Sequence, residues 1–136
     1  MSTNFREVGL DEIKELLLYK TIKEWDVDKL VLDDGTIVTI EMTDNDCCAS
    51  AGGEFIDVKL DAVITDVVLG DNVPNDDAPD DEDLDYQTNT NTLTLYHNQN
   101  PIAIADAYAD NGNGGYYYSV CSLVIGKVFL PIVACY

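Results

Sequence analysis

Lys29-Leu-Val-Leu-Asp-Asp-Gly-Thr-Ile-Val-Thr-Ile-Glu-Met42 is a stretch in which two runs rich in β-branched residues flank the dipeptide Asp34-Gly35. Asp-Gly favours the tight turn of a β-hairpin, because glycine adopts positive φ without steric cost. The stretch therefore predicts two antiparallel strands joined at Asp34-Gly35. Which side chains face the core depends on a turn register that the pattern alone does not define.

The residues around this hairpin predict one helix and further strands. Leu10, Ile13 and Leu17 recur at helical spacing, which predicts an amphipathic helix over 10–19. The small and polar residues Asp44–Gly53 predict a loop. Strand-like patterns occupy 55–69 (one long strand or two short ones), 92–97, 102–108, 116–125 and 127–136. Together these elements predict an α+β domain with one short N-terminal helix and a mainly antiparallel β-sheet of about seven strands.

Length and composition fit one globular domain over residues 1–136, since the chain is 46% hydrophobic. One segment does not fit a core. Asp71–Asp85 contains eight carboxylates and two prolines, so we expect an acidic, flexible loop at about 71–91.

The charge of the chain excludes several classes of partner. The sequence has 26 Asp and Glu against 7 Lys and Arg, a formal net charge of -19. Residues 60–126 contain no Lys or Arg at all. Such a field repels phosphate, so direct binding to DNA, RNA or an anionic membrane is disfavoured.

Targeting signals are not apparent in the sequence, so we expect a cytoplasmic protein. The N-terminus lacks the basic and apolar regions of a secretory signal. The apolar C-terminal stretch is interrupted by Pro131 and is about half the length of a membrane span. In a reducing compartment the four cysteines are expected to be buried as small hydrophobic residues rather than to form disulfides.

Candidate catalytic and metal-binding residues are few. Cys47 and Cys48 are adjacent, so their side chains diverge and cannot easily chelate one ion. His97 is the only histidine, and no nucleophile motif surrounds Ser50, Ser119 or Cys121. We therefore expect no catalytic residue, no metal and no cofactor, and a protein that is not an enzyme. A cysteine- or metal-dependent hydrolase that uses Cys47, Cys48 or His97 is the less favoured alternative.

Two further segments have plain interpretations. Asp110–Gly115 lacks the ligand spacing of a calcium loop and the lysine of a phosphate loop, so we expect a flexible hairpin loop. Tyr116–Tyr118 follows it. In a strand these tyrosines would face alternate sides, so one could serve a protein interface.

The acidic field itself is the main functional signal. Carboxylates on a rigid sheet can imitate the charge of a nucleic acid and occupy a basic groove on a DNA- or RNA-handling protein. The alternative is a structural or assembly protein whose acidity serves solubility. In the first hypothesis the partner-binding residues are Asp76, Asp77, Asp80, Asp81, Glu82, Asp83 and Asp85.

Four short segments resemble an uncharacterised family of small, mostly bacteriophage-encoded proteins with a DG hairpin and a following DCC motif. The segments are Leu18–Ile22, Leu32–Thr36, Asp46–Cys48 and Ile64–Val67, with an echo at Asn100–Ile102. The resemblance implies a phage or prophage setting and brings no catalytic residues. In that setting the alternative structural or assembly protein would be virion-associated, and the basic groove would belong to a host protein. Small acidic phage proteins often inhibit host defence or nucleic-acid enzymes, so an anti-restriction or anti-CRISPR inhibitor in the host cytoplasm is the expectation that follows.

Overall fold

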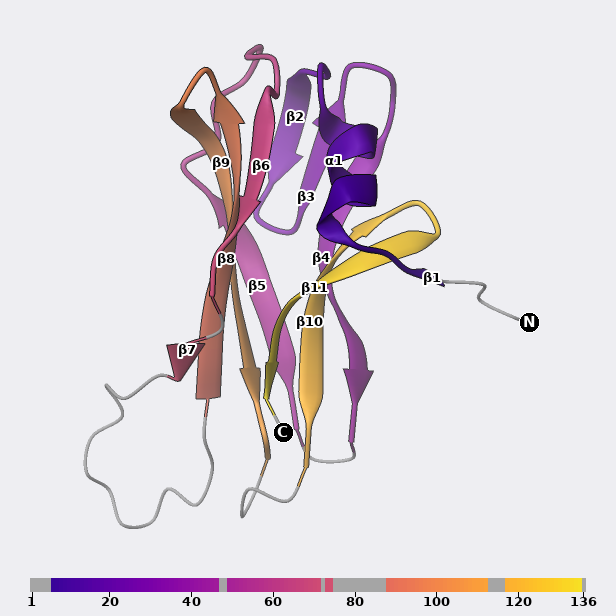
Figure 1. Ribbon diagram of the computed structural model, residues 1–136, viewed down its shortest axis with the longest axis vertical. Coiled ribbons are helices and arrows are strands. Elements are labelled where there is room, and N and C mark those ends of the chain that lie inside the picture. The colour runs from indigo at the N-terminus through magenta and orange to yellow at the C-terminus, as the bar shows by residue number, and fades with distance from the viewer. Residues whose placement is uncertain (1–5, 47–48, 72, 75–87, 113–116, 136) are drawn as a thin grey trace.

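The computed structural model describes residues 6–46, 49–71, 73–74, 88–112 and 117–135. They form two β-sheets that face each other, with one helix beside them (Figure 1). The predicted α+β class with mainly antiparallel sheet is confirmed. The described part of the chain contains eleven strands, two of them only two residues long, instead of about seven.

The helix α1 spans Leu10–Leu17 and buries Ile13 and Leu17. It ends two residues before the predicted boundary. Tyr19 adopts a left-handed backbone with φ 68°, which a helix cannot contain. Its N–H donates to the carbonyl of Ile64 at 2.7 Å, so a tertiary contact accompanies the end of the helix.

Six strands form the first sheet. They are β1 (Arg6–Glu7), β2 (Ile22–Asp26), β3 (Lys29–Leu32), β4 (Ile37–Asn45), β10 (Ser119–Ile125) and β11 (Val128–Cys135), in the spatial order β1-β11-β10-β4-β3-β2. The predicted hairpin is confirmed: β3 and β4 pair antiparallel, and Gly35 has φ 88° in the turn. Only the short β1–β11 pair is parallel.

Five strands form the second sheet. They are β5 (Ala51–Ile56), β6 (Asp66–Leu69), β7 (Val73–Pro74), β8 (Thr88–His97) and β9 (Asn100–Asp110). Their order is β5-β9-β8-β6, and β7 also pairs with β8. The β8–β9 turn places Asn98 and Gln99 at positive φ (47° and 77°), as the tightest hairpin turns require.

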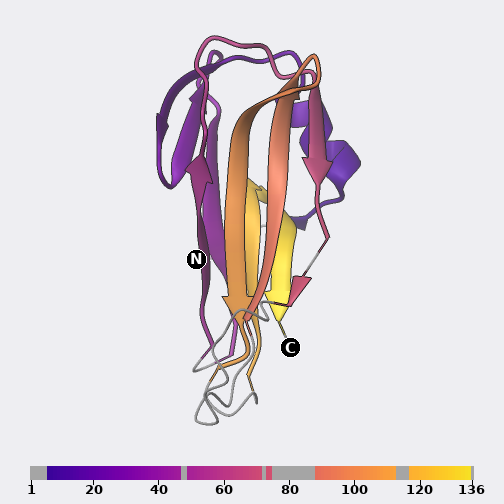
Figure 2. The ribbon, with the colours of Figure 1, turned by 90° about the vertical axis from the view of Figure 1, so that its left-hand side faces the viewer.

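The core lies between the two sheets (Figure 2). Alternate residues of β9 face it, and these are the buried alanines 103, 105, 107 and 109. Larger buried side chains, such as Phe55, Leu93 and Leu123, fill the space around them. Period-two alternation therefore decides which face of each strand is covered.

Two buried asparagines tie the sheets together at one edge. Asn91 Nδ2 donates to the carbonyl of Ile132 at 2.8 Å, and Asn89 Nδ2 donates to the carbonyl of Ala134 at 2.8 Å. Both acceptors belong to β11, beyond its pairing with β1. The side-chain amides of the second sheet thus donate directly to backbone carbonyls of the first sheet.

Two expected boundaries in the first half of the chain are wrong. The loop expected at Asp44–Gly53 is shorter, because β4 continues to Asn45 and β5 begins at Ala51. Gly53 lies so close to β9 that a Cβ there would come within 2.5 Å of the Asp106 carbonyl oxygen. Gly53, which suggested a loop, is therefore required by a close contact between strands. Of the pattern at 55–69, only the ends are strand.

The segment expected to be a flexible loop at about 71–91 is partly strand. Val73–Pro74 and Thr88–Asn91 pair in the second sheet, whereas 75–87 lies outside the described residues. The alternation of Thr and Asn at 88–92 conceals the strand from a hydrophobicity pattern. Asparagine becomes a buried residue here because its amide is hydrogen-bonded.

Candidate functional site

The carboxylates of the described residues lie almost entirely at the surface. Seven of the 26 acidic residues lie within 75–87, which leaves 19 in the described part together with all 7 Lys and Arg. Every one of the 19 is exposed except Asp110, which is half-buried. The folded body is therefore acidic by itself.

The positive charges are confined to one half of the sandwich. We call the other half the acidic half, and define it as residues 43–46, 49–54, 71, 73–74, 88–92, 106–112, 117–121 and 133–135, which pair as strands or lie within two residues of a paired strand. It contains no Lys or Arg. Its carboxylates are those of Asp44, Asp46, Glu54, Asp71, Asp106 and Asp110.

All four ion pairs among the described residues lie outside the acidic half. Lys20–Asp34 and Lys23–Asp61 are separated by 2.9 Å, Arg6–Glu12 by 3.1 Å and Lys14–Asp66 by 3.3 Å. Lys20 and two hydrogen bonds from Thr36 hold the pKa of Asp34 well below its usual range. The cations thus neutralise carboxylates of their own half only.

A hydrogen-bonded cluster stiffens the acidic half where its strands end. The Asp110 carboxylate accepts from the N–H and Oγ of Ser50 (2.9 and 3.0 Å) and from the N–H of Gly112 (3.1 Å). Ser119 Oγ lies 2.7 Å from the Asp110 carbonyl and 3.0 Å from that of Ser50. The cluster joins β5, β9 and β10 and holds the neighbouring carboxylates on a fixed frame.

The predicted partner-binding residues, Asp76, Asp77, Asp80, Asp81, Glu82, Asp83 and Asp85, lie outside the described residues. The residues that flank this segment do not. Pro74 pairs with Asn89 and Thr88 pairs with Asp110, so both flanks belong to the acidic half. The segment that contains these seven acidic residues is therefore connected at both ends to the acidic half.

A hollow of about 560 Å³ opens on the outer face of the second sheet, within the acidic half. It is lined by Gly52, Gly53, Glu54, Thr90, Asp106, Ala107 and Tyr108. Glu54 lies directly opposite Asp106 in the β5–β9 register, and Gly52 lies opposite Tyr108. The sequence pattern does not reveal this site, because it predicts a loop at Gly52 and Gly53. The alternation in Ala105–Asp110 was the one signal that could have placed Asp106 and Tyr108 on one face.

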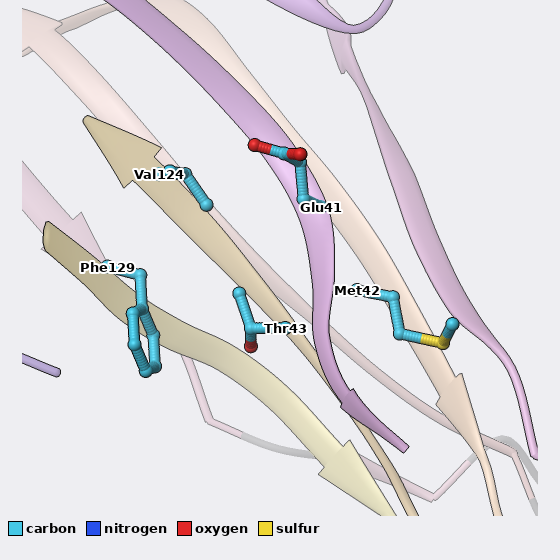
Figure 3. A pocket seen from close by; sticks show the side chains of 5 residues that line it. All are labelled: Glu41, Met42, Thr43, Val124 and Phe129. Carbon is cyan, nitrogen blue, oxygen red and sulfur yellow. The ribbon is translucent and has the colours of Figure 1, made fainter. Parts of the chain in front are cut away.

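A second, smaller pocket of about 180 Å³ lies on the first sheet. Figure 3 shows Glu41, Thr43, Val124 and Phe129 on one side of the strands, whereas Met42 points away from them. Thr43 and Ser122 share a hydrogen bond of 2.7 Å beside it. The pocket is mostly apolar and carries one carboxylate at its rim.

The residues considered for catalysis are not brought together. His97 is at the end of β8, where Nδ1 lies 2.8 Å from the Val63 carbonyl. Ser50 and Ser119 belong to the opposite end of the sandwich and contact Asp110 instead. Cys121 and Cys135 are buried, as expected, and burial raises the pKa of the Cys121 thiol to about 12. Cys47 and Cys48 lie outside the described residues.

Metal and membrane sites are likewise not evident in the part of the chain that the structure describes. Within those residues, no group of three or more His, Cys, Asp or Glu side chains is placed to hold a metal ion. In the same part, no helix is long and apolar enough to cross a membrane.

Comparison with known proteins assigns a family but no activity. Residues 15–124 match a family described as a domain of unknown function, DUF7448. No curated protein and no solved structure matches the chain. The matched range includes the hollow, the acidic segment (residues 75–87) and the strands from β2 to β9, together with most of β10.

Proposed function

The chain belongs to the DUF7448 family, and we propose that it is a non-enzymatic inhibitor that mimics nucleic acid and blocks a basic groove on a host defence or DNA-handling protein. One observation carries the proposal: the acidic half displays six carboxylates and no cation. The acidic segment with Asp76, Asp77, Asp80, Asp81, Glu82, Asp83 and Asp85 attaches to this same half. A phage-encoded protein acting in the host cytoplasm would meet such partners.

The sheet gives the charges a spacing suited to this role. Asp106 and Asp110 belong to one strand and face the same side, four residues apart. At about 3.4 Å per residue they are separated by about 14 Å. One strand of DNA advances about 3.4 Å along the helix axis per phosphate, so this separation equals the axial rise of about four phosphates. Carboxylates along one strand can therefore meet cationic side chains arranged along a nucleic-acid groove.

The mechanism is competitive occlusion. The acidic half repels nucleic acid and attracts a basic groove, so encounter is fast and electrostatically steered. Because the interaction replaces phosphate contacts, it weakens as salt rises.

A displacement experiment tests the proposal. Host proteins are bound to duplex DNA on cellulose, and the purified chain is added at low and at high salt. We expect it to release one or a few proteins at low salt and much less protein at high salt. Free duplex DNA should compete with the chain for the released protein, which mass spectrometry then identifies.

A matched pair of variants shows whether the location of charge matters. The first neutralises part of the acidic segment with Asp80→Asn, Asp81→Asn, Glu82→Gln and Asp83→Asn, and should release at least about tenfold less protein. The control, Asp11→Asn, Glu24→Gln, Asp28→Asn and Asp57→Asn, makes the same charge change at exposed positions of the other half. Equal loss in both variants, or no salt-sensitive release by the parent chain, would contradict the proposal. Self-association that is insensitive to salt would instead favour an assembly protein.

A further inference from the structure

We propose that the hollow on the second sheet is a docking site for an arginine side chain of the partner protein. This inference rests on the proposed function and deepens it, because it names the contact that the folded body makes. The hollow is lined by Gly52, Gly53, Glu54, Thr90, Asp106, Ala107 and Tyr108 on an outer face that no other described element covers.

The two carboxylates of the hollow are placed against each other. Glu54 and Asp106 are direct cross-strand partners on β5 and β9, and both are exposed. Side chains in this relation have Cβ atoms about 5 Å apart, and like charges directly opposite each other disfavour the sheet. None of the four ion pairs among the described residues includes either carboxylate. A cation between them would turn this repulsion into attraction.

The shape of the hollow comes from the glycines and one aromatic ring. A Cβ built at Gly52 would lie 3.3 Å from Tyr108 Oη and 3.4 Å from Tyr108 Cε1, so the ring lies over this glycine. The ring is 44% exposed and forms one wall of the hollow. Thr90, opposite Tyr108 on β8, adds a hydroxyl on the other side.

This combination matches a guanidinium group better than other cations. Guanidinium is planar, donates bidentate hydrogen bonds to carboxylates and stacks on aromatic rings. Lysine offers a point charge without the planar fork. A divalent metal ion would find only two carboxylates here, whereas Ca²⁺ takes six to eight oxygen ligands.

An arginine side chain implies a protein partner. Arginine is also a principal contact to phosphate in protein grooves that bind nucleic acid. An arginine that normally meets phosphate would enter the hollow, while other basic residues of the groove meet the surrounding carboxylates. The hollow thus fixes the orientation of the partner protein, which attraction between net charges alone does not.

NMR titration of the ¹⁵N-labelled full chain tests the assignment. The probes are the capped tripeptide Gly-Arg-Gly and its counterparts with lysine and with citrulline, the neutral isostere of arginine. We expect saturable shifts at the amides of Gly52, Gly53 and Tyr108 with the arginine peptide. Binding should be at least about fivefold weaker for lysine and undetectable for citrulline.

Two double variants provide the control. Glu54→Gln with Asp106→Asn should abolish the shifts of the hollow. Glu24→Gln with Asp28→Asn carries the same charge change on the first sheet and should keep the affinity within about twofold. Equal weakening in both variants overturns the proposal, as do shifts spread evenly over the acidic surface or Ca²⁺ producing the same shifts at lower concentration.

The two proposals fail in distinguishable ways. If the chain releases proteins from DNA-cellulose but the Glu54–Asp106 double variant releases them equally well, the hollow is not the docking site and the inhibitor function stands. If the arginine peptide binds the hollow while no protein is released by the parent chain, the inhibitor function is wrong.

Discussion

Replacing Asn91 by alanine should destabilise the protein more than replacing the exposed polar residues Asn100 or Asp34. Asn91 is 7% exposed, and its Nδ2 donates to the carbonyls of Ile132 (2.8 Å) and Gly70 (3.0 Å). Its Oδ1 accepts from the N–H of Thr92 at 2.8 Å. Asn91→Ala leaves these three backbone groups without their side-chain partner between the sheets.

The magnitude follows mainly from the Ile132 carbonyl, whose hydrogen bond to Asn91 is buried, whereas the bond to Gly70 is only partly buried. A buried polar group that loses its partner costs about 1–3 kcal/mol, so we expect a loss of about 2 kcal/mol in the free energy of unfolding. For a domain of this size that corresponds to a decrease of roughly 7 °C in melting temperature. The loss is a large fraction of the 5–15 kcal/mol that is typical of whole domains.

Urea unfolding, monitored by far-UV circular dichroism, measures the effect. The free energy of unfolding should fall with urea concentration at the same slope in both chains, which shows that the unfolded state is unchanged. Asn100→Ala is the matched control, since Asn100 is exposed at the start of β9 and should cost at most about 0.5 kcal/mol. A loss below about 1 kcal/mol for Asn91→Ala, or one equal to that of the control, would refute the reasoning.

A second substitution at the same position tests the direction of the hydrogen bonds. Asn91→Asp keeps the shape but places a carboxylate against two carbonyl oxygens, so the pKa of the new acid should lie above its unfolded value. The protonated acid can still donate, and the penalty relative to the parent chain should therefore be smallest at low pH and grow as the pH rises. A penalty that is the same at pH 5 and pH 7 would show that the amide donors are not needed.

Three other predictions concern particular contacts. Gly53→Ala should lower stability by about 1–3 kcal/mol, because its Cβ would lie 2.5 and 3.0 Å from backbone atoms of β9. The Cβ of Gly52→Ala would meet only the Tyr108 side chain, at 3.3 Å or more, so thermal melts should show a smaller loss for this variant. Asp34→Asn should lower the melting temperature at pH 7, and its difference from the parent chain should shrink as the pH falls below the unfolded pKa. The folded pKa of Asp34 is depressed, so its stabilisation is fully present above the unfolded pKa and is lost as the pH falls. Cys121 is buried and its pKa is about 12, so its thiol should resist iodoacetamide at pH 8 until the chain unfolds. Site-resolved mass spectrometry measures this labelling, and rapid labelling of the native chain would contradict the placement of Cys121.

Local patterns were sufficient for the elements whose stabilising contacts are close in sequence. The helix was predicted from Ile13 and Leu17, and the hairpin from Asp34-Gly35, and both are present. Patterns failed where a residue type has an unusual environment. Asn89 and Asn91 read as polar loop residues, yet they are buried because carbonyls of β11, more than 40 residues away, accept their hydrogen bonds.

The candidate site shows the same division. The acidic segment and the absence of cations from 60–126 are visible in the sequence, because charge is a property of single residues. Only strand pairing shows that Pro74 and Thr88, which flank the acidic segment, lie in the same half as the carboxylates at 44, 46, 54, 71, 106 and 110.

The sequence by itself determined the sign and size of the charge, the predominance of strands and the position of the first hairpin. Only the tertiary structure decided that Glu54 faces Asp106 and that Tyr108 covers Gly52. The physical reason is that composition and turn chemistry act locally, whereas cross-strand neighbours depend on register. The register between Glu54 and Asp106, 52 residues apart, is chosen by burial of the whole core, and a shift of β5 by one residue would turn Glu54 inward.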